Sequence, residues 1–282
     1  MIDTGFVTAL IAAVLWGSMI VPLKLAKKPD VIWFQLVLAL GTLSGTIIIV
    51  PVAGLLYETN LYGFSTGLIW AAGNILALKS ITKLGMARST PLFVGITIIL
   101  SSTWGILYFK ESIMRFETAL IGLILLLLGI TIVSTTQKQQ NKIWPKEGVI
   151  LAITAGLLLG TQFVPIKMIG ISLETILFPM ALGITAGATI IFLVMGRHIN
   201  IKHLPHGLAS GWIFAAGNYF GIFTISSLGL TIGFSLTQIA VLVSILWGII
   251  YFKEMPESRN QTKIIIAATL ILTGSYVLAS SI

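Results

Sequence analysis

The chain has 282 residues, of which 56% are hydrophobic and only 9% are charged. Because soluble domains carry roughly 25% charged residues, this composition excludes a single soluble core and predicts an integral membrane protein. The formal net charge is +8, but the Lys and Arg residues are scattered over short segments, which argues against nucleic acid as a partner, and the absence of cysteine excludes disulfides and Cys-based metal sites.

Ten apolar segments follow one another along the chain, each near the roughly 20 residues that a helix needs to cross a bilayer. They lie at about residues 4–23, 31–56, 63–82, 90–109, 117–136, 148–168, 174–195, 206–227, 229–252 and 263–282. The sequence therefore predicts an all-α integral membrane protein with ten transmembrane helices.

The chain repeats itself about 143 residues further on. Residues 17–24 (GSMIVPLK) return as 160–167 (GTQFVPIK), 70–74 (WAAGN) as 214–218 (FAAGN), and 104–111 (WGILYFKE) as 247–254 (WGIIYFKE). Because five spans is an odd number, the second repeat enters the membrane in the opposite orientation. The prediction is two inverted five-helix repeats, residues 1–138 and 148–282, joined by a cytoplasmic connector at 139–147.

The basic residues predict the orientation of these spans. All Lys and Arg residues except Lys110, Arg115 and Lys167 lie in the loops after the first, third, fifth, seventh and ninth spans. Loops rich in Lys and Arg stay in the cytoplasm. We therefore expect these loops to be cytoplasmic and both termini to be outside the cell.

Short motifs at the span ends carry a resemblance. The Pro…Lys endings of spans 1 and 6 and the Trp-Gly…Phe-Lys-Glu endings of spans 4 and 9, in a five-plus-five arrangement, resemble the drug/metabolite transporter superfamily. Within it, the chain is most similar to the glucose/ribose porter (sugar uptake) family. The resemblance implies a plasma-membrane carrier without cofactors that imports a glucose-like monosaccharide by alternating access, with proton symport as an option.

The charged residues predict a neutral substrate. Charge at the bilayer centre is costly and usually functional, yet all nine acidic residues fall at span ends or in loops. The chain thus lacks the mid-span carboxylate of a multidrug cation/proton antiporter. It also lacks the mid-span Lys or Arg that a phosphate or nucleotide-sugar carrier would need.

Uncharged polar and aromatic residues near mid-membrane predict the binding site. Asn74 and Asn218 lie halfway along their spans, each one helical turn after an aromatic residue, and a ring beside an amide suits a sugar. Gln162 and Gln238 have no polar repeat partner, as a site for an asymmetric ligand requires. The alternative is that the amides join helices by hydrogen bonds. The predicted lining is Trp16, Trp70, Asn74, Gln162, Phe214, Asn218 and Gln238, with Thr97, Ser101, Trp104, Ser244 and Trp247 as further candidates.

Two Lys-Glu combinations predict a gate. With the assigned topology, Lys24 and Glu254 lie on the cytoplasmic side, while Lys167 and Glu111 lie on the external side. We expect two ion pairs across the repeats, one forming as the other breaks during alternating access. The alternative is lysines that extend to the interface and never meet a glutamate.

Glycine and proline predict packing and hinges. Gly41 and Gly45 in span 2 match Gly183 and Gly187 in span 7, and this GxxxG spacing predicts close helix contacts. Pro22 and Pro165 lie near the ends of spans 1 and 6, where they can act as hinges.

The remaining titratable residues predict little chemistry. Glu58 and Glu174 are the carboxylates near span ends without an adjacent lysine, so they are the candidates for proton coupling. His198, His203 and His206 share a loop without carboxylate or cysteine partners, so no metal site is expected. A metal-dependent membrane enzyme would need paired carboxylates, which no span carries. The alternatives are an exporter of amino acids or other neutral metabolites and a channel or scramblase.

Overall fold

The computed structural model describes residues 2–26, 30–84, 86–111, 115–134, 145–170, 172–196, 198–247, 251–252 and 258–281. These residues form helices, and no strand occurs among them. In the first half the elements are α1 (Ile2–Ser18), α2 (Val21–Leu25), α3 (Val31–Val52), α4 (Leu61–Leu84), α5 (Met86–Thr103), η1 (Trp104–Tyr108) and α6 (Phe116–Ser134). In the second half they are α7 (Lys146–Thr161), α8 (Val164–Met168), α9 (Leu173–Met195), η2 (Ile201–His203), α10 (Leu204–Gly229), η3 (Leu230–Phe234), α11 (Ser235–Thr237), α12 (Ala240–Leu246) and α13 (Ser258–Ala279).

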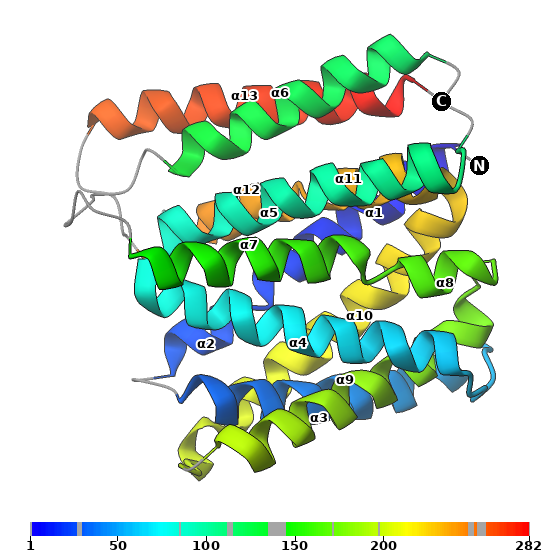
Figure 1. Cartoon of the computed structure of the whole chain (residues 1–282), viewed down its shortest axis with the longest axis vertical. Helices are drawn as coiled ribbons and strands as arrows, with labels where there is room; N and C mark the ends of the chain where they lie inside the picture. The colour runs from blue at the N-terminus through cyan, green and yellow to red at the C-terminus, as the bar shows by residue number, and fades with distance from the viewer. Residues whose placement is uncertain are drawn as a thin grey trace.

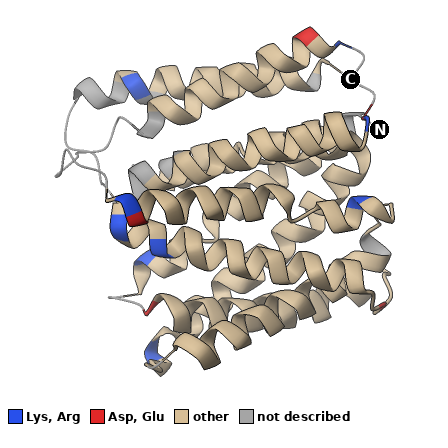
Figure 2. Ribbon diagram, in the orientation of Figure 1, with Lys and Arg blue, Asp and Glu red and all other residues tan. Residues whose placement is uncertain are grey.

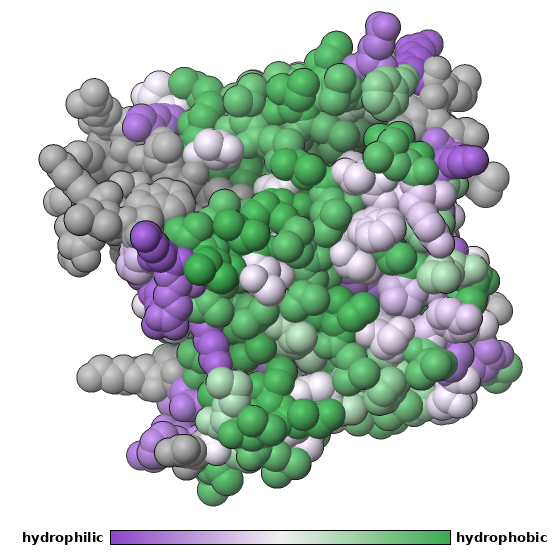
Figure 3. Space-filling model, viewed as in Figure 1, coloured by the Kyte–Doolittle hydropathy of each residue, from purple (hydrophilic) through white to green (hydrophobic). Residues whose placement is uncertain are grey.

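Six helical stretches among the described residues are long and apolar enough to cross a membrane: Thr4–Leu25, Val31–Val52, Leu61–Leu84, Lys146–Met168, Thr175–Met195 and Ile201–Ser244. Shorter apolar helices cover Leu92–Tyr108, Phe116–Ile132 and Ile265–Leu278. Charged residues gather at the two ends of the helices (Figure 2). An apolar surface lies between these ends (Figure 3). This distribution is that of a multi-pass membrane protein.

The longest apolar stretch contains a reversal of the chain. α10 ends at Gly229, whose φ of +80° favours glycine. η3 then packs back against α10. The approach is so close that a Cβ on Gly233 would lie 2.8 Å from the Thr224 carbonyl oxygen. In the first half, α3 ends at Val52 rather than at residue 56, before Gly54 with φ of +70°.

Three of the predicted spans are interrupted, the first and sixth in their last third and the ninth near its middle. α1 gives way to α2 at Met19 and Ile20, and α7 gives way to α8 at Gln162 and Phe163. In each case a proline, Pro22 or Pro165, lies in the first turn of the second helix, where it needs no hydrogen-bond partner for its nitrogen. The predicted ninth span is interrupted as well, between α11 and α12. Interrupted helices place backbone polar groups inside the bundle, as transporters do at binding sites.

The helix contacts in one half have counterparts in the other. α4 packs against α9 and α7, while α10 packs against α3 and α1. α6 and α13 lie side by side (Figure 1). The predicted GxxxG contacts are present: a Cβ on Gly41 would lie 2.6 Å from the Leu208 carbonyl oxygen, and a Cβ on Gly187 would lie 2.8 Å from Ala71 Cβ. Glycine therefore allows α3 to approach α10 and α9 to approach α4.

Candidate functional site

A cavity of about 170 Å³ lies between the two halves at the helix interruptions. Helices α1, α4, α5, α7, α10 and α12 line it, together with parts of α2, α3, α9 and η3. Pockets for drug-sized ligands have volumes of roughly 300–1,000 Å³, so this cavity suits a small molecule. Its lining includes all seven residues predicted from the sequence: Trp16, Trp70, Asn74, Gln162, Phe214, Asn218 and Gln238.

The aromatic residues of the lining form one cluster. Trp70 and Phe214, which occupy equivalent positions in the two repeats, stack on each other with ring centroids 4.3 Å apart. Trp16 lies beside them, 6.3 Å from Phe214 and 6.4 Å from Phe234 between ring centroids. The two equivalent rings of the repeat therefore pack directly on each other.

The two repeat-related asparagines line the cavity and also join helices. The Asn74 amide nitrogen donates to Gln35 Oε1, which links α4 to α3. Trp16 Nε1 donates to Asn218 Oδ1 over 3.2 Å, which links α1 to α10. The two bonds join helices, as the alternative interpretation of the sequence expects, and because each bond occupies only part of an amide the role in binding stays a prediction.

The two glutamines that lack polar repeat partners lie at the interruptions. Gln162 lies between α7 and α8, and in the described part of the chain its buried Oε1 has no hydrogen-bond partner. Gln238 lies between α11 and α12, with Nε2 3.5 Å from the Phe234 carbonyl oxygen and 3.4 Å from Thr237 Oγ1. These amides retain hydrogen-bonding capacity for hydroxyl groups of a ligand.

The further candidates divide into two groups. Thr97 and Ser244 line the cavity. Ser101, Trp104 and Trp247 are not among the described residues of the lining. The two tryptophans form equivalent bonds instead, Trp104 Nε1 to Thr161 Oγ1 over 3.3 Å and Trp247 Nε1 to Ser18 Oγ over 2.8 Å.

An ion pair lies at the end of the bundle that is predicted from the sequence to be outside the cell. Lys167 Nζ lies 3.0 Å from Glu111 Oε1. The Glu111 carboxylate also accepts hydrogen bonds from the backbone N–H groups of Leu230, over 2.6 Å, and Thr231, over 2.8 Å. The carboxylate thus caps η3 where the chain reverses at Gly229. This cap was not predicted from the sequence. Gly229 was the feature that could have indicated a turn at this position.

The environment of Glu111 favours the ionised form. Burial alone would raise the pKa of this carboxyl, but the hydrogen bonds from Thr231 and Leu230 and the Lys167 ammonium more than offset it. The pKa of Glu111 therefore lies below its ordinary value.

The second predicted pair lies partly outside the described residues, because Glu254 is not among them. Lys24 Nζ lies 5.0 Å from the centroid of the Phe252 ring, as Lys167 Nζ lies 6.0 Å from that of Phe109. Of the coupling candidates, Glu58 is exposed in the loop between α3 and α4, away from the cavity. The side chain of Glu174 is outside the described part.

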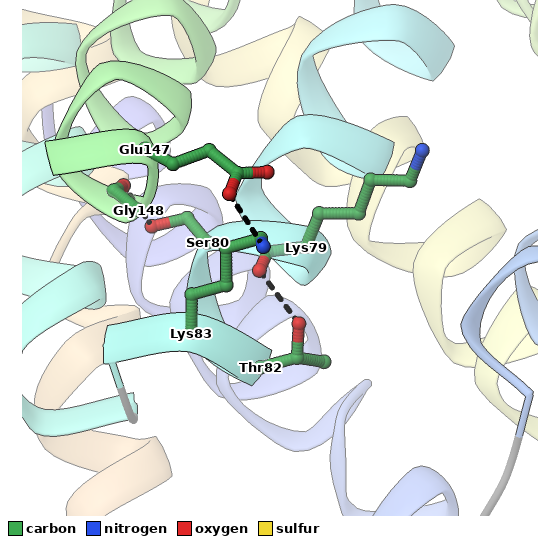
Figure 4. A network of polar contacts seen from close by, with 6 residues as sticks. All are labelled: Lys79, Ser80, Thr82, Lys83, Glu147 and Gly148. Carbon is green, nitrogen blue, oxygen red and sulfur yellow. Dashed lines mark hydrogen bonds and ion pairs between the residues drawn. The ribbon is translucent and has the colours of Figure 1, made fainter. Parts of the chain in front are cut away.

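A polar network at the opposite end of the bundle ties α4 to α7 (Figure 4). Lys83 Nζ lies 2.7 Å from Glu147 Oε2, and Ser80 Oγ donates to the Gly148 carbonyl oxygen over 3.0 Å. Exposed ion pairs contribute only about 0–1 kcal/mol, so the buried serine is the more important contact. Its counterpart in the other half is the 3.0 Å bond from Thr224 Oγ1 to Thr8 Oγ1 between α10 and α1.

Comparison with known families identifies the family of this protein. The family described as "Sugar transport protein" matches residues 7–281. The chain belongs to the sugar transport protein family. This family is part of the drug/metabolite transporter superfamily and consists of transporters, not enzymes, so the resemblance drawn from the motifs is confirmed.

Relatives from several bacteria match along nearly their whole length. The glucose uptake protein GlcU of Bacillus subtilis (strain 168) is 26% identical over 284 residues, covering 96% of each chain. Proteins named probable glucose uptake protein GlcU match at 26% identity in Bacillus anthracis and 27% in Priestia megaterium, again with 96% of each chain covered. A solved crystal structure that is 14% identical superposes with a TM-score of 0.76 over 98% of this chain and 96% of its own, so the fold is shared.

Proposed function

We propose that this sugar transport family member is a secondary transporter that imports a neutral, glucose-like monosaccharide by alternating access. The observation that carries the proposal is the cavity, whose lining combines stacked aromatic rings with four amide side chains and contains no charged residue among the described ones. Amides donate to and accept from hydroxyl groups, and rings cover C–H faces. Relatives named glucose uptake proteins support the same substrate class.

We propose the architecture of ten spans in two inverted repeats as the basis of this activity. The reversal at Gly229 divides the stretch Ile201–Ser244 into two spans, and the shorter apolar helices supply the rest. The exchange of contacts between halves, α4 with α9 against α10 with α3, supports a two-fold relation. Both ends of the chain lie at the same end of the bundle, as an even number of crossings requires (Figure 1).

The arrangement fits the inward-facing step of the cycle. The cavity lining extends from the interruptions to Leu23, Ile81 and Thr90, which lie toward the ends that the positive-inside rule assigns to the cytoplasm. At the other end, Phe163 and Phe234 pack edge to face at 5.1 Å between centroids, and the Lys167–Glu111 pair lies beyond them. We propose that this pair closes the external side, and that Lys24 with Glu254 closes the cytoplasmic side when it opens.

Proton coupling belongs to the proposal as an option with named residues. Glu58 and Glu174 remain the candidates for a coupled proton. Glu111 is a poor candidate, because its hydrogen bonds and Lys167 keep it ionised. Uptake whose pH dependence is unchanged in the doubly substituted Glu58→Gln, Glu174→Gln protein would remove both residues from the proposal.

The deciding experiment is uptake of radiolabelled glucose into proteoliposomes that contain the purified protein, with ribose, rhamnose and alanine as competitors. We expect saturable uptake that unlabelled sugar blocks and alanine does not. A folded protein that takes up no sugar but exchanges alanine would replace the proposal with an exporter of neutral metabolites. Uptake that does not saturate would indicate a channel. Comparison with and without an inward proton gradient tests coupling.

A further inference from the structure

The two repeats hold their cavity asparagines by different partners. Asn218 receives a hydrogen bond from the Trp16 indole, 3.2 Å from Nε1 to Oδ1. Asn74 instead bonds to the amide of Gln35, a fully buried residue that does not line the cavity. Both asparagines are more than nine-tenths buried. Equivalent amides therefore enter the cavity under different constraints.

The sequences of the two repeats differ at the positions of these hydrogen-bond partners. The counterpart of Trp16 is Leu159, and the two occupy equivalent places: a Cβ on Gly217 would clash with the Trp16 ring, and a Cβ on Gly73 would lie 2.9 Å from Leu159 Cγ. Counted back from the matched glycines Gly41 and Gly183, the counterpart of Gln35 is Leu177. Both polar partners thus come from the first half, Trp16 from its first predicted span and Gln35 from its second, and the second half has leucine at both matching positions.

The chemistry of these partners differs in one respect. An indole N–H can only donate, so Asn218 must give its carbonyl oxygen to Trp16, and its NH₂ group is left over. A Gln–Asn pair can reverse both amides and keep its hydrogen bond, so Asn74 can offer the cavity either its oxygen or its NH₂ group.

We propose that Asn218 is an obligatory hydrogen-bond donor to the substrate, that Trp16 is the positioning residue that fixes this polarity, and that Asn74 is an adaptable contact. The inference rests on the proposed function and specifies its substrate recognition. The sugar hydroxyl at Asn218 must accept a hydrogen bond. The site therefore rejects a sugar with an ammonium group at that ring position, because ammonium can only donate, and tolerates one with fluorine there, because fluorine can accept a hydrogen bond.

The test is competition against labelled glucose by a series of monosaccharides in which one hydroxyl at a time is replaced by hydrogen or by fluorine. One ring position is expected at which the fluoro sugar competes better than the deoxy sugar, by about 3- to 10-fold, the value of one hydrogen bond. In Asn218→Asp the NH₂ group is replaced by an acceptor, so the preference at that position should reverse while glucose, whose hydroxyl can turn to donate, still binds.

Three further variants separate positioning from folding. Trp16→Phe frees the Asn218 amide to rotate, so the fluoro-to-deoxy ratio should fall toward one; this variant carries the test if Asn218→Asp does not fold. Asn74→Asp, the repeat-matched control, should not reverse the ratio at the Asn218 position, because Gln35 can turn to donate. Trp247→Phe removes an indole N–H that bonds Ser18 outside the cavity lining, and should leave the ratio unchanged.

The outcomes distinguish the inference from the function beneath it. A ratio that stays unchanged in Asn218→Asp or Trp16→Phe, in protein that still binds labelled glucose, overturns the polarity and leaves sugar transport standing. A wild-type protein that binds no sugar overturns both.

Discussion

Lys167 and Glu111 form an ion pair of 3.0 Å that brings together three segments of the chain. Lys167 lies in α8, Glu111 follows η1, and the same carboxylate caps η3 through the N–H groups of Leu230 and Thr231. Only 11% of the Glu111 side chain and 25% of the Lys167 side chain are exposed. The pair therefore links the end of η1 with α8 and η3 at one point, so that a displacement of one of these segments would strain its contacts with the other two.

Removing the carboxylate should cost more than removing the lysine. Glu111→Ala breaks the pair and also leaves two backbone N–H groups uncapped, whereas Lys167→Met leaves the cap in place. Losing one partner of a buried pair costs about 3–5 kcal/mol, so we expect Glu111→Ala to lower the unfolding temperature clearly more than Lys167→Met, with uptake reduced in both. Thermal unfolding in detergent measures this. Equal losses would show that the cap contributes nothing.

The charge exchange at this pair should fail. A lysine at position 111 cannot accept hydrogen bonds from Leu230 and Thr231, so combining Glu111→Lys with Lys167→Glu restores the pair but not the cap. We expect uptake by the double variant to remain as low as in either single variant. Recovery of uptake would mean that charge alone holds this end closed.

The pH dependence of stability should carry the signature of Glu111. The folded-state pKa of this carboxyl is depressed. Its contribution to stability is therefore fully present above the pKa of an unfolded glutamate, about 4.3, and is lost as the pH falls from there through the lower folded-state pKa. We expect the unfolding temperature of the wild type to fall in this acid window more steeply than that of Glu111→Gln. Curves that run parallel through the window would contradict the assignment.

The location of the cavity could be predicted because polar groups are scarce in this chain. An amide in an apolar span must find a hydrogen-bond partner inside the protein, and its position along the span gives its depth in the membrane. Asn74, Asn218, Gln162 and Gln238 accordingly line one cavity. Their role in binding stays a prediction. The glycine pairs likewise predicted contacts that the structure contains, because a GxxxG face has no side chain to pack otherwise.

The partners of these residues could not be predicted from the sequence. The bond between Gln35 and Asn74 depends on how α3 is rotated against α4, and the stacking of Trp70 on Phe214 depends on how the two repeats meet. Neither rotation is encoded in the spacing along one span. The interruption at Gln238 was missed because no proline follows it, whereas Pro22 and Pro165 follow the other two.

Close packing of α3 on α10 predicts unequal effects of adding a methyl group to glycine. In Gly41→Ala the new Cβ would lie 2.6 Å from the Leu208 carbonyl oxygen, and such overpacking costs about 1–3 kcal/mol. The control is Gly95→Ala in α5, where the nearest atom would be 3.8 Å away and alanine favours the helix by about 0.5–1 kcal/mol. Unfolding temperatures should fall in the first variant and hold or rise in the second. A fall in both would mean that glycine is needed for reasons other than contact.

Gln162 should affect substrate affinity with little effect on stability. Its buried Oε1 has no hydrogen-bond partner in the described residues, so the protein loses no bond to that oxygen when Gln162→Met replaces it with the residue found at the equivalent Met19. A sugar hydroxyl that uses this acceptor would lose a hydrogen bond, so KM for uptake should rise about 3- to 10-fold. The control is Gln35→Met, which removes a bonded amide outside the lining and should lower the unfolding temperature more. If Gln162→Met instead destabilises the protein and leaves KM unchanged, the amide supports the interruption between α7 and α8 and does not contact the sugar.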